Sequence, residues 1–157
     1  MRLTPGGPVL VFGGSFDPPT NGHIDIVKRG LKIFDKIIVA IMRNPNKKGL
    51  FTIEERKEML EASLKEYSNV EIDSFNGLTV DYAAQKGVTA MIRGMRVVSD
   101  FEGEFQLAMI NRKLNKEIET VSLMAGLSWV FISSSIVKEA ASFGGDVTNM
   151  VPPIVNQ

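Results

Sequence analysis

Short apolar runs alternate along the chain with segments in which apolar residues recur at helical spacing. Five runs rich in apolar and β-branched residues predict buried strands at residues 9–12, 36–41, 70–72, 88–92 and 120–123. Between the first two runs, Ile24, Val27 and Leu31 are spaced as on one face of a helix. Such alternation predicts a parallel sheet that is covered by helices on both faces.

Local start signals place the remaining helices. Thr52 and Glu55 form a capping box, which predicts a helix from there to about residue 67. Further helices are predicted at residues 80–85, at 100–114 and up to 141, the last one capped by Ser133 or Ser134. The predicted fold is therefore α/β, a doubly wound, parallel, five-stranded sheet of the Rossmann-like type, as one domain over residues 1–157. In such sheets ligands bind beyond the carboxyl ends of the strands.

Composition narrows the classes of protein. The chain has 157 residues, and its 18 basic residues balance 18 acidic ones, which argues against an extended nucleic-acid surface. It has no cysteine, so disulfides, a thiolate nucleophile and cysteine-ligated metal sites are excluded. No apolar run reaches the roughly 18 residues that span a bilayer, and residues 1–7 lack the features of a secretory signal. We expect a soluble, cytoplasmic protein without a membrane partner.

The loop after the first predicted strand has the composition of a phosphate site. Gly13 and Gly14 allow a tight turn, and Thr20 or Asn21 can cap the helix that follows. His23, the only histidine, falls in the first turn of that helix, whose free N–H groups suit an anion. A packed histidine at a helix start is the alternative, but the glycine-rich setting favours a functional role.

Further predicted strand ends also carry donors to anionic oxygens. Lys47 follows the second strand and is expected to reach the same cleft, whereas its neighbour Lys48 is interpreted as solvated. Arg93 and Arg96 follow the fourth strand, with surface salt bridges as the alternative. A cluster of three serines follows the fifth, with simple helix capping as the alternative, at Ser133, Ser134 and Ser135.

No protein nucleophile with a base beside it and no metal-ligand cluster accompanies these donors. The set therefore fits phosphate-group chemistry by positioning and charge stabilisation, without a covalent enzyme intermediate. On the predicted helix at 100–114, Asp100 and Glu104 are interpreted as exposed acids. That helix has two apolar stripes, for which we expect one to pack on the sheet and the other to form a subunit interface.

Several motifs resemble one known family. The Thr-x-Gly-His pattern at 20–23 and the Ile-Ser-Ser-Ser pattern at 132–135 resemble the two motifs of the nucleotidyltransferase superfamily. Bacterial phosphopantetheine adenylyltransferases are similar over nearly the whole chain, in particular at residues 16–18, 21–27, 51–56, 92–96, 133–139 and 145–148. Together these motifs are highly specific, although each one alone is not.

The resemblance implies a reaction and its partners. Members of this family transfer AMP from ATP to 4′-phosphopantetheine, which yields dephospho-coenzyme A and pyrophosphate in coenzyme A biosynthesis. They use magnesium and are usually homohexamers. We therefore expect ATP, Mg²⁺, the phosphorylated acceptor and further copies of the chain as partners.

The resemblance also implies residue roles. His23 would stabilise the transition state, with Lys47 and Arg96 as further catalytic residues. Positions matching the phosphopantetheine side are Ser15, Lys47, Thr79 and Arg93. Positions matching the ATP side are Ser15, Phe16, His23, Gly94, Met95, Arg96, Glu104, Trp129, Val130, Phe131, Ile132, Ser133, Ser134 and Ser135. For Glu104 the resemblance replaces the interpretation as an exposed acid. No protein residue is assigned as a metal ligand.

The chain departs from the family pattern at a few positions. Gly13 stands where proline is common and Ser15 where threonine is frequent, but Ser15 retains the hydroxyl. The terminal helix of the family is expected to be short or absent after residue 153. The first loop also resembles nicotinate mononucleotide adenylyltransferase, but that relative usually carries histidine where this chain has Thr20. Two rival hypotheses of a different class are a nucleotide sensor without turnover and a purely structural protein.

Overall fold

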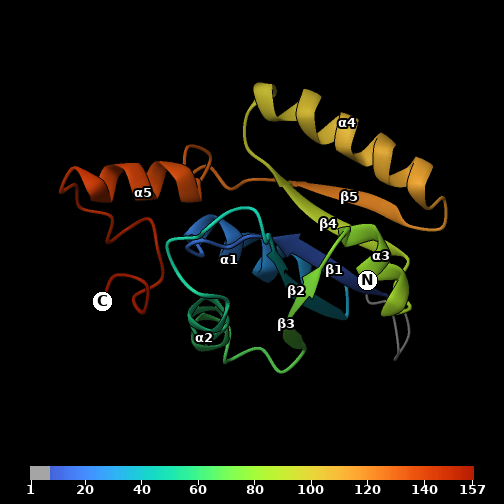
Figure 1. The fold of residues 1–157 in the computed structure, drawn as a ribbon, viewed down its shortest axis with the longest axis horizontal. Helices are drawn as coiled ribbons and strands as arrows, with labels where there is room; N and C mark the ends of the chain where they lie inside the picture. The colour runs from blue at the N-terminus through green and yellow to red at the C-terminus, as the bar shows by residue number, and fades with distance from the viewer. Residues whose placement is uncertain (1–7) are drawn as a thin grey trace.

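The computed structural model describes residues 8–157, apart from the side chains of Val98 and Ser99. Its centre is one parallel sheet of five strands in the order β3-β2-β1-β4-β5 (Figure 1). The strands are β1 (Val9–Gly14), β2 (Lys36–Arg43), β3 (Val70–Asn76), β4 (Ala90–Met95) and β5 (Glu119–Met124). The order reverses at β1, so the ends of β1 and β4 flank the switch point where such sheets bind ligands. The predicted Rossmann-like α/β fold is confirmed.

The helices form two layers because successive side chains of a strand face opposite sides of the sheet. They are α1 (Asn21–Gly30), α2 (Ile53–Ser63), α3 (Thr79–Gln85), α4 (Val98–Leu114) and α5 (Ser134–Ser142). Leu10 and Phe12 of β1 pack with α1 and α2, whereas Val11 packs with α3 on the other face. Figure 1 shows α4 lying along β5 at one edge, and α5 at the opposite side of the molecule.

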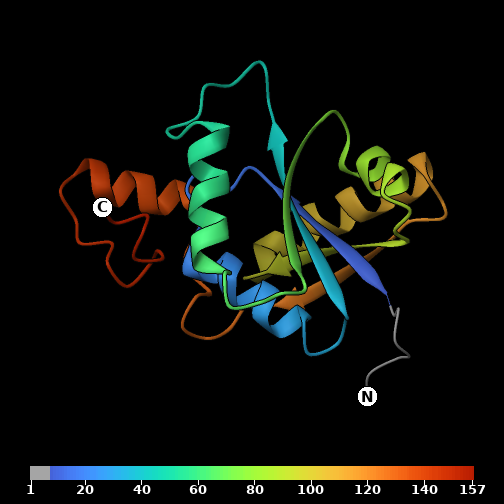
Figure 2. The ribbon, with the colours of Figure 1, turned by 90° about the horizontal axis from the view of Figure 1, so that it is seen from below.

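Most element boundaries agree with the sequence predictions to within a few residues. The capping box of Thr52 and Glu55 is present, but α2 ends at Ser63 because the chain turns there to enter β3. The first helix also ends early, at Gly30, and Leu31 packs on the core from the turn that follows. Figure 2 shows the loop between β2 and α2 reaching beyond the end of β2.

The expected burial of α4 is wrong for the single chain. Six large apolar side chains of this helix are between 39% and 55% exposed: Phe101, Phe105, Leu107, Met109, Ile110 and Leu114. Neither apolar stripe is therefore buried against the sheet, although the helix contacts β4 and the edge strand β5. Met124 of that edge strand is exposed as well.

The C-terminal segment after α5 turns back toward the start of α1. The side chain and backbone N–H of Asn21 donate to the carbonyls of Asn149 and Met150 at 3.1 and 2.9 Å. Residues 143–157 form turns, without a further α-helix in this stretch. Among the described residues, no helix combines the length and the apolar character that crossing a bilayer requires. The expectation about a secretory signal concerns residues 1–7, which lie outside the described residues.

Candidate active site

The start of α1 holds the only histidine through a capping box. Thr20 is the N-cap, and its hydroxyl oxygen accepts from the backbone N–H of His23 at 3.3 Å. In return the Thr20 backbone N–H donates to Nδ1 of His23 at 2.9 Å. Because Nδ1 acts as the acceptor, the neutral imidazole carries its proton on Nε2. The local sequence Thr-x-x-His thus selects one tautomer of the ring.

Packing and charge keep this imidazole neutral. The ring of Phe16 meets that of His23 edge-on, with 4.9 Å between centroids, and Phe16 is itself buried in a left-handed backbone conformation with φ of 49°. Burial, and then the positive charges of Arg96 and Arg93, lower the pKa of His23 to about 4. At neutral pH the ring therefore presents an uncharged Nε2–H donor.

Arg93, at the end of β4, is held by a carboxylate from α4. Its Nε and Nη2 donate to the two oxygens of Glu104 at 3.0 and 2.9 Å, which is the paired geometry that guanidinium and carboxylate prefer. Its Nη1 donates to the carbonyl of Gly13 at 3.1 Å. Arg93 thus ties the end of β4 both to α4 and to the loop after β1.

Arg96 is held in a similar way by the nearest acid along the chain. Asp100 Oδ2 accepts from the backbone N–H and from Nε of Arg96, both at 3.1 Å. Nη1 donates to the carbonyl of Ile132 at 3.1 Å, across the cavity. The interpretation of Asp100 and Glu104 as exposed acids is wrong, because both reach back to the strand end and line the site. Salt bridges do form, but inside the cleft rather than on the outer surface.

The serines before α5 have partly structural roles. Ser133 is the N-cap, and its hydroxyl oxygen accepts from the backbone N–H of Ile136 at 3.2 Å. Ser134 donates to the carbonyl of Pro18 at 2.7 Å, which joins α5 to the loop after β1. The capping alternative is therefore correct for Ser133, although both residues also line the cleft.

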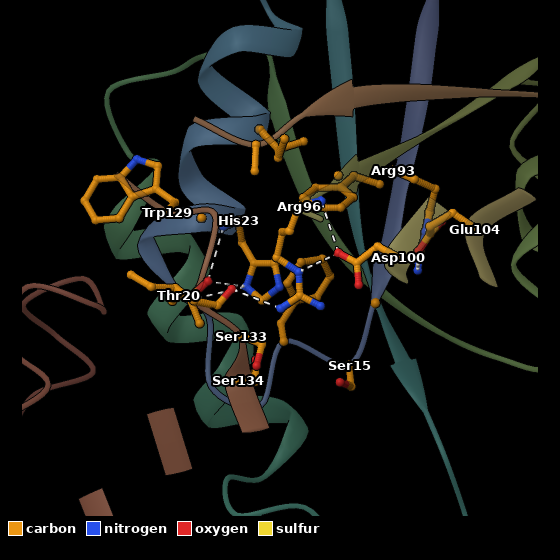
Figure 3. A pocket seen from close by; sticks show the side chains of 18 of the residues that line it. Ser15, Thr20, His23, Arg93, Arg96, Asp100, Glu104, Trp129, Ser133 and Ser134 are labelled. Carbon is orange, nitrogen blue, oxygen red and sulfur yellow. Dashed lines mark hydrogen bonds and ion pairs between the residues drawn. The ribbon is translucent and has the colours of Figure 1, made fainter. Parts of the chain in front are cut away.

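These elements enclose a cavity of about 250 Å³ at the carboxyl edge of the sheet (Figure 3). The sequence-predicted site residues that line it are Ser15, Phe16, His23, Arg93, Gly94, Arg96, Glu104, Trp129, Ile132, Ser133 and Ser134. In Figure 3, His23 and Arg96 lie side by side, with Trp129 on one flank and Arg93 on the other. Loops that are far apart in the sequence thus meet around one set of cations and N–H donors.

Comparison with known proteins identifies the family of the chain. The cytidylyltransferase-like family model matches residues 11–140. A phosphopantetheine adenylyltransferase from Desulfatibacillum aliphaticivorans is 63% identical over 147 residues, which cover 94% of this chain and 84% of that protein. One from Desulfosudis oleivorans is 58% identical over 149 residues, which cover 95% and 89%. The chain belongs to the phosphopantetheine adenylyltransferase family.

A solved structure gives the fold of this family a wider context. A protein from Vibrio parahaemolyticus, proposed to be a nicotinate-nucleotide adenylyltransferase, superposes with a TM-score of 0.67 over 94% of this chain and 95% of its own. Its sequence identity is only 18%, so the similarity concerns the fold alone. The family relatives, at far higher identity, do not favour nicotinate mononucleotide as the acceptor.

A second cavity lies beside the first and carries the acceptor-side lysine of the family pattern. It measures about 610 Å³ and is lined by the loop between β2 and α2, including Lys47 and Lys48. The expectation that Lys47 reaches the first cleft is wrong, because Lys47 lines only this second cavity. Lys48 also borders this cavity and is exposed, as its interpretation as solvated predicted. Ser15 lines both cavities and so marks the passage between them.

Five further predicted site residues line neither cavity. They are Thr79, Met95, Val130, Phe131 and Ser135. Thr79 begins α3, and its methyl group lies 2.7 Å from where a Cβ on Gly13 would stand, so it packs beneath the first loop. Phe131 is 78% exposed, in the loop between β5 and α5.

Sequence reasoning missed three charged residues beside the second cavity, namely Asp17, Arg56 and Lys138. A signal existed for one of them. Arg56, Met59 and Leu60 recur at helical spacing, and all three are buried on one face of α2. A charged residue on an otherwise apolar helix face indicates a buried partner. For Asp17, the sequence shows only its place within a motif.

The carboxylates that line the cleft already have partners within the protein. Of the carboxylates that line it, Glu104 and Asp100 are engaged by arginines. No group of three or more His, Asp or Glu side chains suited to a metal occurs within residues 8–157.

Proposed function

We propose that this chain transfers the adenylyl group of ATP to 4′-phosphopantetheine, with dephospho-coenzyme A and pyrophosphate as products. The observation that carries the proposal is the convergence of His23, Arg93 and Arg96 in one cavity at the switch point of the sheet. The family to which the chain belongs supplies the identity of the two substrates. The cavity by itself supports a nucleotide phosphate site.

The reaction is a direct in-line displacement. An oxygen of the acceptor phosphate, already ionised at neutral pH, attacks the α-phosphorus of ATP, and the bond to the β-phosphate oxygen breaks as pyrophosphate leaves. Neither proton removal nor a covalent enzyme intermediate is required, which matches a cleft lined by donors and cations without an activated nucleophile. The protein contributes position and charge stabilisation.

His23 acts in this scheme as a hydrogen-bond donor and not as a base. Its Nδ1 is occupied by the Thr20 N–H, so Nε2–H is free to donate to the charge that develops on the α-phosphate. Its low pKa means that the donor is neutral when the cleft is empty. The donation costs no proton transfer and no reorientation of the ring at the moment of reaction.

The arginines can bind phosphate oxygens while they keep their protein partners. Arg93 uses one N–H of each of its three nitrogens within the protein, so the second N–H groups of Nη1 and Nη2 can bind an anion while Glu104 stays in place. Arg96 has bonds at Nε and Nη1, while Nη2 makes none among the described residues. A phosphate oxygen can therefore bind Arg96 without breaking its pair with Asp100. On this basis Arg96 binds the triphosphate and Arg93 binds on the acceptor side, each beside its carboxylate partner.

Lys47 steers the acceptor phosphate from the second cavity toward Ser15 and the first. ATP enters with Mg²⁺, whose charge neutralises the leaving pyrophosphate. We assign the reaction to the cytoplasm.

The test is incubation with ATP, magnesium and phosphopantetheine, with dephospho-coenzyme A detected by mass. Parallel incubation with nicotinate mononucleotide should release no pyrophosphate. ATP binding without turnover on either acceptor would contradict the proposal.

We propose that copies of the chain cover the exposed apolar face of α4 and β5, in a homohexamer as the family pattern implies. The supporting observation is the row of large apolar side chains that the single chain leaves open, including Phe101, Phe105 and Met124. Charged substitution at Phe105 should shift sedimentation toward smaller species. A wild-type protein that sediments as a strict monomer at micromolar concentration would exclude this assembly.

A further inference from the structure

Two buried charged side chains, Asp17 and Arg56, lie beside the second cavity and have no part in the proposed chemistry. Their residues are only 5% and 7% exposed. A buried ion pair contributes little net stability compared with apolar residues of the same size, because both ions lose their hydration. The contacts of the pair therefore need an explanation other than stability alone.

The Asp17 carboxylate anchors the loop that carries Lys47. Its Oδ2 accepts from the backbone N–H of Leu50 at 2.8 Å, and its Oδ1 from that of Phe51 at 2.9 Å. Burial raises the pKa of Asp17, but these N–H groups, Arg56 and Lys138 together bring it below its ordinary value, so it is ionised. Lys47 stands only three residues before the anchored Leu50, and the other end of its loop leaves β2 at Arg43.

Arg56 links that loop to the neighbouring one. Its Nε donates to the Phe51 carbonyl at 2.9 Å and lies 3.4 Å from Asp17 Oδ1. Its Nη1 donates to the Ser15 carbonyl at 3.3 Å. A Cβ on Gly49 would overlap the guanidinium, so the loop passes as close to it as glycine allows. One guanidinium thus fixes the residue that joins the two cavities relative to the loop that bears Lys47.

The start of α5 joins the same cluster. Lys138 Nζ lies 3.5 Å from Asp17 Oδ2. One turn before it, Ser134 donates to the carbonyl of Pro18 at 2.7 Å. Asp17 therefore lies where its own loop, the loop between β2 and α2, and helix α5 meet, and all three segments supply residues to the two cavities.

We propose that Asp17 and Arg56 are positioning residues that hold Ser15 and the Lys47 loop in one geometry for the incoming acceptor phosphate. This inference rests on the proposed function, since it concerns how the acceptor is presented to ATP. The ion pair fixes the position of one loop relative to the other. It thus keeps the distance from Lys47 to Ser15 constant, while the lysine side chain itself stays free to bind.

The test is a double-mutant cycle that combines Arg56→Lys with Lys47→Ala. Arg56→Lys keeps the charge but cannot reach Phe51, Ser15 and Asp17 together. We expect it to raise the KM for phosphopantetheine about tenfold, since small misplacements of binding groups can cost up to about 10²-fold, with the KM for ATP within about twofold. In the Lys47→Ala background the same substitution should raise the acceptor KM by no more than about twofold.

Matched variants keep the test interpretable. Lys57→Met changes an exposed cation on the same helix and should leave both KM values unchanged. Lys138→Met removes an outer member of the cluster, 34% exposed in its side chain, and should raise the acceptor KM about threefold without loss of fold. It keeps the proposal testable if Arg56→Lys fails to fold. Faster tryptic cleavage after Lys47 in Lys138→Met, at an unchanged Tm, is the geometric readout.

The outcomes separate this inference from the proposed function. Absence of dephospho-coenzyme A with the wild-type protein overturns the function itself. Normal wild-type turnover together with equal rises in both KM values, or with independent effects of Arg56 and Lys47 in the cycle, overturns only the positioning role. A loss of thermal stability with unchanged KM values would likewise reduce the pair to a structural element.

Discussion

The two cavities that meet at Ser15 hold their cations in different ways. In the first cavity each functional side chain rests against a protein partner: Arg93 against Glu104, Arg96 against Asp100 and His23 against Thr20. In the second cavity Lys47 is exposed, and its ammonium group makes no hydrogen bond or ion pair within the described part of the chain. The proposed phosphate donors of the smaller cavity are therefore held by partners, whereas the ammonium group of Lys47 in the larger cavity is not.

This difference matches the two tasks of the proposed reaction. Stabilisation of a transition state requires donors that do not reorganise as charge develops, and paired side chains satisfy that requirement. Capture of an acceptor requires only attraction and a clear path, which an exposed lysine on an anchored loop provides. Substitutions in the first cavity should thus lower kcat, whereas substitutions in the second should raise the KM for the acceptor.

The largest effect is expected for His23→Ala. Loss of the Nε2–H donor should lower kcat by about 10²–10³-fold and change the KM for ATP by only a few-fold, because the donor acts mainly in the transition state. Steady-state release of pyrophosphate measures both values. His23→Gln retains a capping-box side chain at the third helical position, so it should keep the Tm while kcat stays low. Near-normal turnover in either variant would refute the role of His23.

A smaller loss is expected for Arg96→Lys. A lysine ammonium lacks the planar, forked guanidinium group, so it cannot bind Asp100, the Ile132 carbonyl and a phosphate at the same time. Since one charge-assisted hydrogen bond contributes about 1.5–3 kcal/mol, kcat/KM for ATP should fall about 10- to 100-fold. Arg112→Lys is the control, because its pair with Glu119 is exposed on the surface. Equal activity of the two variants would remove the distinction between the cleft and the surface.

In the second cavity, Lys47→Ala should raise the KM for phosphopantetheine about tenfold, with kcat changed by only a few-fold. The difference from wild type should shrink at high salt, because the charge is exposed and screened. Lys48→Ala tests whether the position of the lysine on the loop matters. The logarithm of its increase in KM for phosphopantetheine should be less than half of that for Lys47→Ala. A fall in kcat of Lys47→Ala as deep as that of His23→Ala would erase the contrast between the cavities.

The smallest effect concerns pH and stability. The pKa of His23 is about 4 in the folded chain, below the ordinary value of 6.5, so the unfolded state takes up the proton first as pH falls. Stability that is present above pH 6.5 is therefore lost progressively toward pH 4. Between pH 7 and pH 5 the Tm of the wild type should fall about 4–8 °C further than that of His23→Gln. Parallel pH profiles would show that the ring is not held neutral.

Site residues were predictable where they directly follow the end of a predicted strand. The positions of His23 after β1 and of Arg93 and Arg96 at β4 follow from the alternation of strands and helices, and the structure brings all three together. Asp100 and Glu104 were not predictable from the residues alone. Whether a helical acid faces water or a strand end depends on how α4 lies across the sheet, and helical spacing does not specify that placement.

Local chemistry in the sequence determined the strands, the capping boxes, the phosphate-binding composition of the loops and, through its motifs, the family. These properties depend on neighbours within a few residues or on recognisable patterns. Only the tertiary structure decided that Lys47 faces a separate cavity, that Asp17 and Arg56 join two loops and helix α5, and that the apolar stripes of α4 stay exposed in the single chain. The physical reason is that these contacts bring together residues distant in sequence, so they depend on how the elements pack and not on any local pattern.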